Sequence, residues 1–364
     1  MVVWESLSPA LAKDTALLRR AYVVLCMLGH FYLHGAPKNS RSGSSDSESA
    51  HRKNFVPAPI AIPWLLVSKA LGLKPVLSYA SQILWNCAYN DISLLDDPLP
   101  SGQIRILETF TGDSSEVAFD ISPARVELEG AVILKAILDV LATHFQGSDL
   151  IQSQSAVTLE LLRIESALRR MKSHLLILKK DCDPFHFYWK LRPLISGSGP
   201  EGWTYELSGG SVINLQVGGS TAGSSSLLQA LDSFLGLHLS DSQISFRRAM
   251  QEYMPQGHRL FCHGPDLLRI SGLKLGHAYN SVVRGLKEFR DEHFRIVSLF
   301  IINQASKAQK NIENNPSFVE ESSLKKSNLT TKPKISLTGT GGSDLARLLK
   351  GYRDSSQEAL LDLS

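Results

Sequence analysis

Two long segments of this chain repeat their apolar residues at the spacing of an α-helix. They are residues 127–145 and 157–180, and in the second Leu161, Ile164 and Leu168 recur every three or four positions. Such a stripe is typical of a helix that buries one face against its neighbours. Because no alternating segment of convincing length separates the two, the pattern predicts an all-α fold.

Further helices are expected on both sides of this pair. The stretch 21–33 is apolar but interrupted by His30, and it is shorter than the about 20 residues that a membrane span needs, so we interpret it as a buried helix. Residues 75–89 also show helical spacing, and 278–302 form a long late helix. Every predicted element is therefore helical.

Changes in composition divide the chain into two parts. We expect a small N-terminal, mainly helical domain at 1–111, with a disordered Ser-rich insertion at 37–55, and a large all-α domain at 112–364. The Gly- and Ser-rich stretch 197–226 and the polar tract 304–338 are predicted to be loops, and loops of that length are often functional.

The charge balance excludes several functional classes. The 38 Lys and Arg residues nearly balance the 35 Asp and Glu residues, so we expect no nucleic-acid partner. The N-terminal sequence MVVWESLSPALAKD carries charges where a signal peptide needs an apolar core, and the four cysteines form no CxxC pair. These features predict a cytoplasmic protein without a membrane anchor or a disulfide framework.

His293 lies in the apolar stripe of the late helix. One interpretation is a core histidine bonded to a backbone carbonyl, because an unsatisfied buried polar group costs about 1 to 3 kcal/mol. The other is a metal or heme ligand, with Arg290 one turn earlier to neutralise an acidic group. A solvent-facing arginine would give the same pattern, so the helix alone decides neither point.

Residues 183–193, DPFHFYWKLRP, combine aromatic rings with one arginine. On a helix Tyr188 and Arg192 share a face and Phe187 lies beside them, an arrangement suited to an amino acid with an aromatic side chain. The alternative is a core helix whose arginine extends to solvent.

Two glycine-rich segments and one group of histidines are less specific. The stretch 218–226 lacks the GK[ST] ending of a nucleotide P-loop. Residues 339–343 precede a helix that Ser343 or Asp344 would cap, so they form either a carboxylate site or an ordinary linker. The spacing of His258, Cys262, His263 and His277 matches no standard zinc site.

Several stretches taken in order resemble one family. They are IAIPW at 60–64, PVLSYA at 75–80, FTGDSS at 110–115, FYWKLRPLISG at 187–197, GSTAGSSSLLQALDSFLG at 219–236, YMPQGHRLF at 253–261, FRDEHFRIVSLFI at 289–301 and GTGGSDLARLLK at 339–350. The chain thereby resembles the indoleamine 2,3-dioxygenases, heme proteins that oxidatively cleave the indole ring. The MPxxHRxF, GTGG and FRxxH motifs are the most diagnostic.

The resemblance implies a large helical domain that holds heme b, with a smaller N-terminal helical domain stacked on it. His293 would be the proximal iron ligand, and Arg290 and Asp232 would lie near a heme propionate. Arg192 and Thr340 would bind the polar end of the substrate. The other implied pocket residues are Phe187, Ser122, Tyr79, Phe119, Thr221, Ala222 and Gly223.

The same resemblance implies that O2 is inserted across the indole C2–C3 bond, converting L-tryptophan to N-formylkynurenine. The implied partners are an indole substrate, O2 and a reductant that keeps the iron ferrous, and the protein is expected to be a monomer. No side chain is expected to act as an acid or base.

The chain departs from the family pattern at three positions. Ala118 stands where many members carry a pocket phenylalanine, and Ser220 and Ser224 replace a glycine and a glutamine of the GGSAGQSS loop. A wider pocket motivates an alternative, a tailoring dioxygenase of another indole compound in secondary metabolism. A non-catalytic heme sensor or helical interaction protein is a further alternative.

Overall fold

A computed structural model of the chain describes residues 11, 13–35, 54–89, 103–145, 150–262, 275–307 and 344–363. The described residues are mainly helical, with two small sheets, which confirms the predicted fold class. The Ser-rich residues 37–53 and most of the polar tract 304–338 lie outside the described residues.

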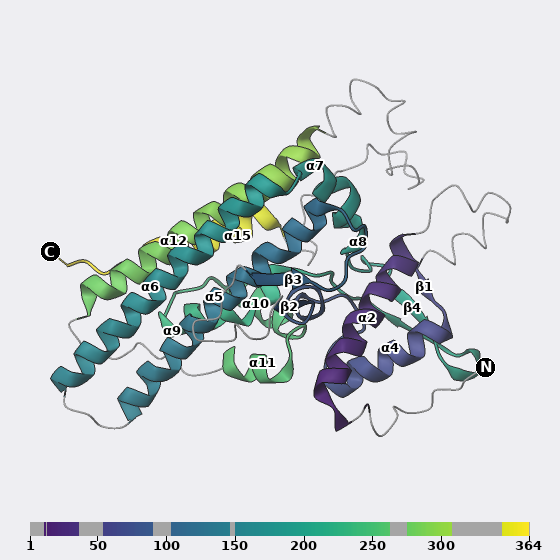
Figure 1. The fold of residues 1–364 in the computed structure, drawn as a ribbon, viewed down its shortest axis with the longest axis horizontal. Coiled ribbons are helices and arrows are strands. Elements are labelled where there is room, and N and C mark those ends of the chain that lie inside the picture. The colour runs from purple at the N-terminus through teal and green to yellow at the C-terminus, as the bar shows by residue number, and fades with distance from the viewer. Residues whose placement is uncertain are drawn as a thin grey trace.

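The long helices lie side by side in Figure 1. Helix α5 (Ser114–Phe145) packs along α6 (Leu150–Asp181), and α12 (Gly276–Val297) packs against α6 and against α15 (Leu345–Glu358). The widened turn η7 (Ser298–Ile302) extends α12. These helices include the long amphipathic segments that the sequence predicted.

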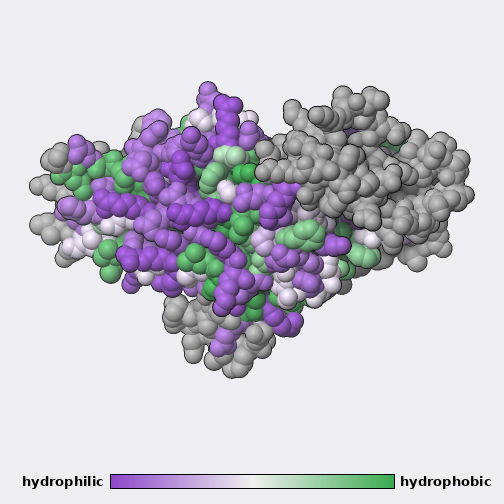
Figure 2. Space-filling view, turned by 90° about the horizontal axis from the view of Figure 1, so that it is seen from above, coloured by the Kyte–Doolittle hydropathy of each residue, from purple (hydrophilic) through white to green (hydrophobic). Residues whose placement is uncertain are grey.

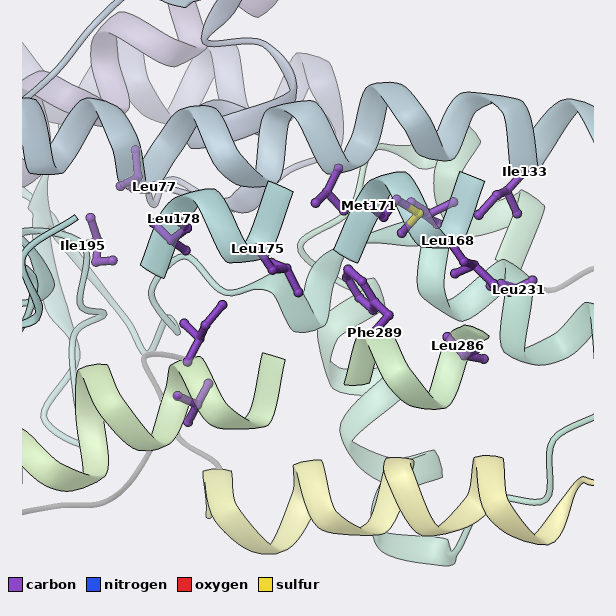
Figure 3. Packing of buried hydrophobic residues seen from close by; sticks show 14 of the residues in the cluster. Leu77, Ile133, Leu168, Met171, Leu175, Leu178, Ile195, Leu231, Leu286 and Phe289 are labelled. Atoms are coloured by element: carbon purple, nitrogen blue, oxygen red, sulfur yellow. The ribbon is translucent and has the colours of Figure 1, made fainter. Parts of the chain in front are cut away.

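Apolar side chains between these helices form the core. In Figure 3 the side chains of Leu168, Met171 and Leu175 of α6 lie in the space between the helices, as do those of Leu286 and Phe289 of α12. All five are buried. At about 25 cal/mol per Å² of apolar surface removed from water, stripes of this kind supply most of the stability of a helical bundle.

The outer faces of the long helices carry charged residues together with exposed apolar ones such as Leu138, Leu162 and Leu176. Figure 2 shows hydrophilic residues over much of the described surface, with hydrophobic residues in scattered patches. Ion pairs join Lys135 to Asp139 at 2.7 Å along α5 and Lys172 of α6 to Glu288 of α12 at 2.9 Å. Exposed pairs contribute only about 0.2 to 1 kcal/mol each, so packing dominates.

The N-terminal helices α2 (Thr15–His34) and α4 (Ala58–Leu71) pack against each other beside a three-stranded sheet. In this sheet β1 (Phe55–Val56) runs parallel to β4 (Trp203–Glu206), and β4 runs antiparallel to β5 (Val212–Leu215). A strand of the first part therefore pairs with one from the second. The proposed domain boundary at 111/112 stays a prediction.

Strands β4 and β5 contradict the predicted loop at 197–226. Trp203 and Tyr205 are buried and alternate with partly exposed neighbours, which is the pattern of a half-buried strand. Gly202, Gly209 and Gly210 have positive φ, so they form turns around the strands. Because glycine is typical of loops, the composition of this stretch did not reveal its two short strands. Phe55, assigned to the insertion, is instead paired with Thr204.

The predicted helix at 75–89 is also wrong in part. It is reduced to the widened turn η1 (Ala80–Leu84), and β2 (Cys87–Tyr89) follows and pairs antiparallel with β3 (Ile104–Ile106). At one end of this strand pair, the side-chain amide of Asn86 donates a hydrogen bond to the backbone carbonyl of Glu108 at 2.8 Å. It also accepts one from the backbone N–H of Glu108 at 2.9 Å. These contacts with a distant segment replace continued helix. Residues 304–307, assigned to the second loop, are helical.

Helix α2 is, within the described residues, the helix whose length and composition would allow a membrane span. Its Tyr22, Cys26 and His30 are fully buried inside the protein, so packing accounts for the apolar character of that face. Leu17, Leu28 and Phe31 are exposed.

Short elements connect these parts. Their bounds are Pro184–His186 for α7, Phe187–Leu191 for η4, Arg192–Leu194 for α8, Ser208–Gly210 for η5, Ala222–Ser224 for η6, Ser226–Phe234 for α9, Asp241–Gln251 for α10 and Gln256–Cys262 for α11.

Candidate active site

A cavity of about 270 Å³ lies among η1, α5, the α7–η4–α8 segment, the loop 220–225, α9, α12 and α15. Its lining is mostly apolar with a few polar groups, as is usual for small-molecule sites. All predicted site residues that the structure describes line it. These are Tyr79, Phe119, Ser122, Phe187, Arg192, Thr221, Ala222, Gly223, Asp232, Arg290 and His293. Their individual roles stay predictions.

His293 faces this cavity from α12. Burial and the nearby Arg290 guanidinium lower the pKa of His293 to about 4, so its imidazole is neutral at neutral pH. No hydrogen bond joins it to any other described residue, which disagrees with the core-histidine interpretation. A neutral imidazole that borders a cavity without a partner suits a metal ligand.

Arg290, one turn before His293, belongs to a buried polar network. Its guanidinium donates to the Asp232 carboxylate at 2.5 Å, to the Ser356 hydroxyl at 2.6 Å and to the Tyr352 carbonyl at 3.1 Å. Asp232 is on α9 and the other two are on α15, so the network fixes both helices against α12. One cation paired with one carboxylate can still receive a further acidic group at the cavity.

Arg192 and the aromatic residues beside it form another wall. The Arg192 guanidinium carbon lies 5.4 Å from the centroid of the Tyr188 ring, which confirms that the two share a face. The centroid of the Phe187 ring lies 4.4 Å from the centroid of the Phe119 ring and 5.7 Å from that of the Phe300 ring. Burial lowers the pKa of Arg192, yet a guanidinium remains a cation at neutral pH. A carboxylate at Arg192 would therefore have aromatic surface beside it.

The loop 220–225 is held close to the cavity by its own bonds and by α9. The Thr221 hydroxyl accepts from the Gly223 N–H at 3.3 Å, and the Gln229 amide donates to the Gly223 carbonyl at 3.1 Å. A Cβ on Gly223 would lie 2.6 Å from Cζ of Phe246, so an alanine at this position would displace the Phe246 ring.

Some predicted residues are placed differently. The Ser122 hydroxyl donates to the His174 carbonyl of α6 at 3.0 Å, so it is engaged with backbone although the residue borders the cavity. Thr340 lies outside the described residues, as does His263. Within the described part of the chain, no group of three or more His, Cys, Asp and Glu side chains is arranged for a metal ion.

The sequence did not predict two polar residues that line the cavity, Glu127 and Gln82. Glu127 on α5 accepts a hydrogen bond from the Tyr79 hydroxyl at 3.0 Å, and Gln82 on η1 donates to Asp120 at 2.8 Å. The available signal was that Glu116, Asp120 and Glu127 recur at helical spacing on a helix that is otherwise apolar inward.

The site as a whole fits a planar iron porphyrin. It offers a neutral histidine with no hydrogen-bond partner among the described residues, a buried arginine for an acidic substituent and apolar walls. Fold and site thus define a helical protein suited to a heme group and a small carboxylate beside it.

The sequence profile of the indoleamine 2,3-dioxygenase family matches residues 4–359. The chain belongs to this family.

Individual relatives agree with this assignment. The chain is 30% identical to indoleamine 2,3-dioxygenase of Saccharomyces cerevisiae, over 96% of this chain and 79% of that protein. It is 30% identical to indoleamine 2,3-dioxygenase 2 of Homo sapiens, over 86% and 74% respectively. It is 29% identical to 6-hydroxytryptophan 2,3-dioxygenase of Fusarium equiseti, over 98% and 85%.

Members of the family are heme-dependent dioxygenases of indole compounds. The chain is accordingly an oxidoreductase of the dioxygenase type, with an indole and O2 as reactants.

Proposed function

We propose that the protein binds heme b and converts L-tryptophan to N-formylkynurenine, the first step of the kynurenine pathway. The observation that supports this best is the cavity itself, which His293 and Arg192 both line. His293 is suited to bind the iron of a cofactor, and Arg192 is suited to bind the carboxylate of an amino acid.

His293 would be the proximal ligand of the iron. Its depressed pKa of about 4 keeps a ring nitrogen unprotonated at neutral pH, as ligation requires. Arg290 would meet a heme propionate while Asp232 and Ser356 hold its guanidinium in place. Bound heme would supply the ferrous iron that activates dioxygen.

Arg192 would receive the substrate carboxylate in a bidentate bond, and Phe119 and Phe187 would pack on the indole. Thr340 would contact the same polar end of the substrate. Holding the indole in this way lowers the entropic part of the barrier, and the apolar walls exclude water. No protein group has to move a proton in this scheme.

The first experiment measures the heme-loaded, reduced protein. We expect absorbance at the formylkynurenine band to rise with L-tryptophan, and the Soret band of the ferrous protein to shift or vanish in His293→Ala. Absence of product with L-tryptophan, D-tryptophan and tryptamine would overturn the proposed activity. An unchanged Soret band in His293→Ala would overturn the ligand assignment.

A second candidate is a dioxygenase of another indole compound. Its support is that one relative is named a 6-hydroxytryptophan 2,3-dioxygenase. Ala118 does not line the cavity, since its side chain packs against the hydrophobic core. Substituted and peptide-linked indoles test it, and exclusive turnover of free tryptophan would reject it.

We further propose a cytoplasmic monomer that needs an external reductant to keep its iron ferrous. Light scattering of the purified protein tests the oligomeric state, and fractionation of cells tests the compartment. Turnover assays with and without an added electron donor test the need for the reductant.

A further inference from the structure

A hydrogen bond joins the loop 220–225 in the cavity wall to helix α9. The side-chain amide of Gln229 donates from Nε2 to the backbone carbonyl of Gly223 at 3.1 Å. Gln229 is buried, and both residues line the cavity. The bond therefore links a cavity-lining loop to a helix of the surrounding fold.

Helix α10 fixes the orientation of the Gln229 amide. Its Oε1 accepts hydrogen bonds from Nε of Arg247 at 3.2 Å and from Nε2 of Gln251 at 3.0 Å. An arginine N–H can only donate and a backbone carbonyl can only accept, so the oxygen must face α10 and the NH2 group must face the loop. Arg247 is itself held, because it also donates to the backbone carbonyl of Gln229 and to the Ser233 hydroxyl.

The middle of the loop is a compact turn. The hydroxyl and the N–H of Ser224 both donate to the Thr221 carbonyl, at 2.8 and 3.1 Å. Gly223 packs against α10, since an added Cβ would meet Phe246 at 2.6 Å. The turn is thus held by α9 through the amide of Gln229 and by α10 through packing.

We propose that Gln229 is a positioning residue for the dioxygenase reaction, because it fixes residues 221–223 in the wall of the cavity. The catalytic part of this inference rests on the proposed function, in which Arg192 holds the carboxylate of the substrate. The indole must be held in one geometry to react, and a misplacement of about 1 Å can cost about 100-fold in rate. A displaced wall leaves the indole poorly aligned while Arg192 still binds the carboxylate.

Two variants remove the bond in different ways. Gln229→Glu keeps an oxygen for Arg247, but its carboxylate has no N–H for the Gly223 carbonyl. Gln229→Met has a similar length without donor, acceptor or charge. The matched control is Gln243→Glu on α10. Gln243 is buried and does not line the cavity, and its Oε1 accepts from the Ser240 N–H at 2.8 Å, a role that glutamate also fills.

Hydrogen–deuterium exchange of the full chain, with and without heme, measures the loop directly. The N–H groups of Ser224 and Ser225 donate to the carbonyls of Thr221 and Ala222 at 3.1 and 3.0 Å. We expect the peptide that contains them to exchange about tenfold faster in both Gln229 variants, because the turn opens more often without its anchor. Peptides of α12 should exchange as in the wild type, and Gln243→Glu should change neither.

Steady-state kinetics of the heme-loaded enzyme with L-tryptophan measure the consequence. We expect kcat to fall about 10- to 100-fold in both Gln229 variants. KM should change little because Arg192 still binds the carboxylate, and the Soret band should be that of the wild type. Gln243→Glu should keep the wild-type kcat.

Four results would overturn the inference. They are unchanged exchange of the loop peptide in the Gln229 variants, equally faster exchange in α12, unchanged kcat despite faster loop exchange, and an equal loss of kcat in Gln243→Glu. A loss of kcat in Gln229→Glu but not in Gln229→Met would assign the effect to the new charge and also reject the proposal. If the wild type oxidises no indole, the proposed function fails, whereas the exchange measurement still tests the anchor.

Discussion

A single buried histidine is predicted to make the stability of this protein sensitive to mild acid. His30 of α2 is fully buried, and its Nε2 accepts from the Leu77 N–H at 2.8 Å, so the proton must be on Nδ1, which donates to the Leu194 carbonyl at 2.8 Å. The ring thus joins α2 to two segments that lead directly to the cavity residues Tyr79 and Arg192.

Burial, with a smaller contribution from His34, lowers the pKa of His30 from 6.5 to about 3. Because the folded-state pKa is below the unfolded value, the stabilisation is fully present above pH 6.5 and is lost as the pH falls toward 3. The loss is about 1.4 kcal/mol for each pH unit in that window.

The perturbation is His30→Gln, which removes the titration. At about pH 7.5 we expect the variant to be less stable by about 1 to 3 kcal/mol, since the Leu77 N–H or the Leu194 carbonyl loses good geometry. At about pH 5.5, protonation of His30 has lowered the unfolding free energy of the wild type by about 1.4 kcal/mol, whereas the variant has no such loss. The difference in stability between the two proteins therefore narrows by that amount.

Urea denaturation of the heme-free protein measures both free energies. Trp64 and Trp203 report by fluorescence, since their rings lie 6.1 and 5.1 Å from the His30 ring. Groups that do not contact residue 30 contribute equally to the unfolding free energies of both proteins and cancel in the difference. A gap that is the same at both pH values, or that widens in acid, would refute this account of His30.

Three further predictions concern the site and its supports. Arg192→Lys, which loses bidentate geometry, should lower kcat/KM about 100-fold for L-tryptophan but much less for tryptamine; equal losses in steady-state assays would contradict carboxylate binding. Gly223→Ala should lower kcat/KM about tenfold because Cβ meets Phe246 at 2.6 Å, whereas Gly257→Ala, with no atom within 4 Å, should not. Asp344→Ala removes the side-chain bond to an N–H of α15 and should cost about 0.5 to 2 kcal/mol in urea denaturation; an unchanged midpoint would contradict the cap.

The helical core could be predicted because its signal is long and local. The apolar spacing of Leu161, Ile164 and Leu168 extends over several turns, and these residues are all buried. Strands β4 and β5 could not be predicted in the same way, since four residues give little periodicity and β4 depends on a partner near residue 55.

The sequence motifs predicted which residues line the cavity, but they did not predict which hydrogen bonds those residues form. Spacing placed Arg192 beside Tyr188 correctly, whereas the bond from Ser122 to the α6 backbone depends on how two helices meet. Glu127 was not predicted because its bonding partners, Tyr79 and Ser225, stand just before η1 and α9, far away in sequence.

Three widened turns, η1, η4 and η7, each contribute cavity-lining residues, namely Gln82, Phe187 and Phe300 among others. Each is a single π-helical turn, a form that occurs often at functional sites. In η7, which continues from α12, the wide turn accommodates one residue more than an α-helical turn does, so its five residues advance the chain by about the same angle as four α-helical residues at about 100° each. A one-residue deletion in η7 would therefore remove a residue from the cavity wall, while the helical residues on either side keep their direction.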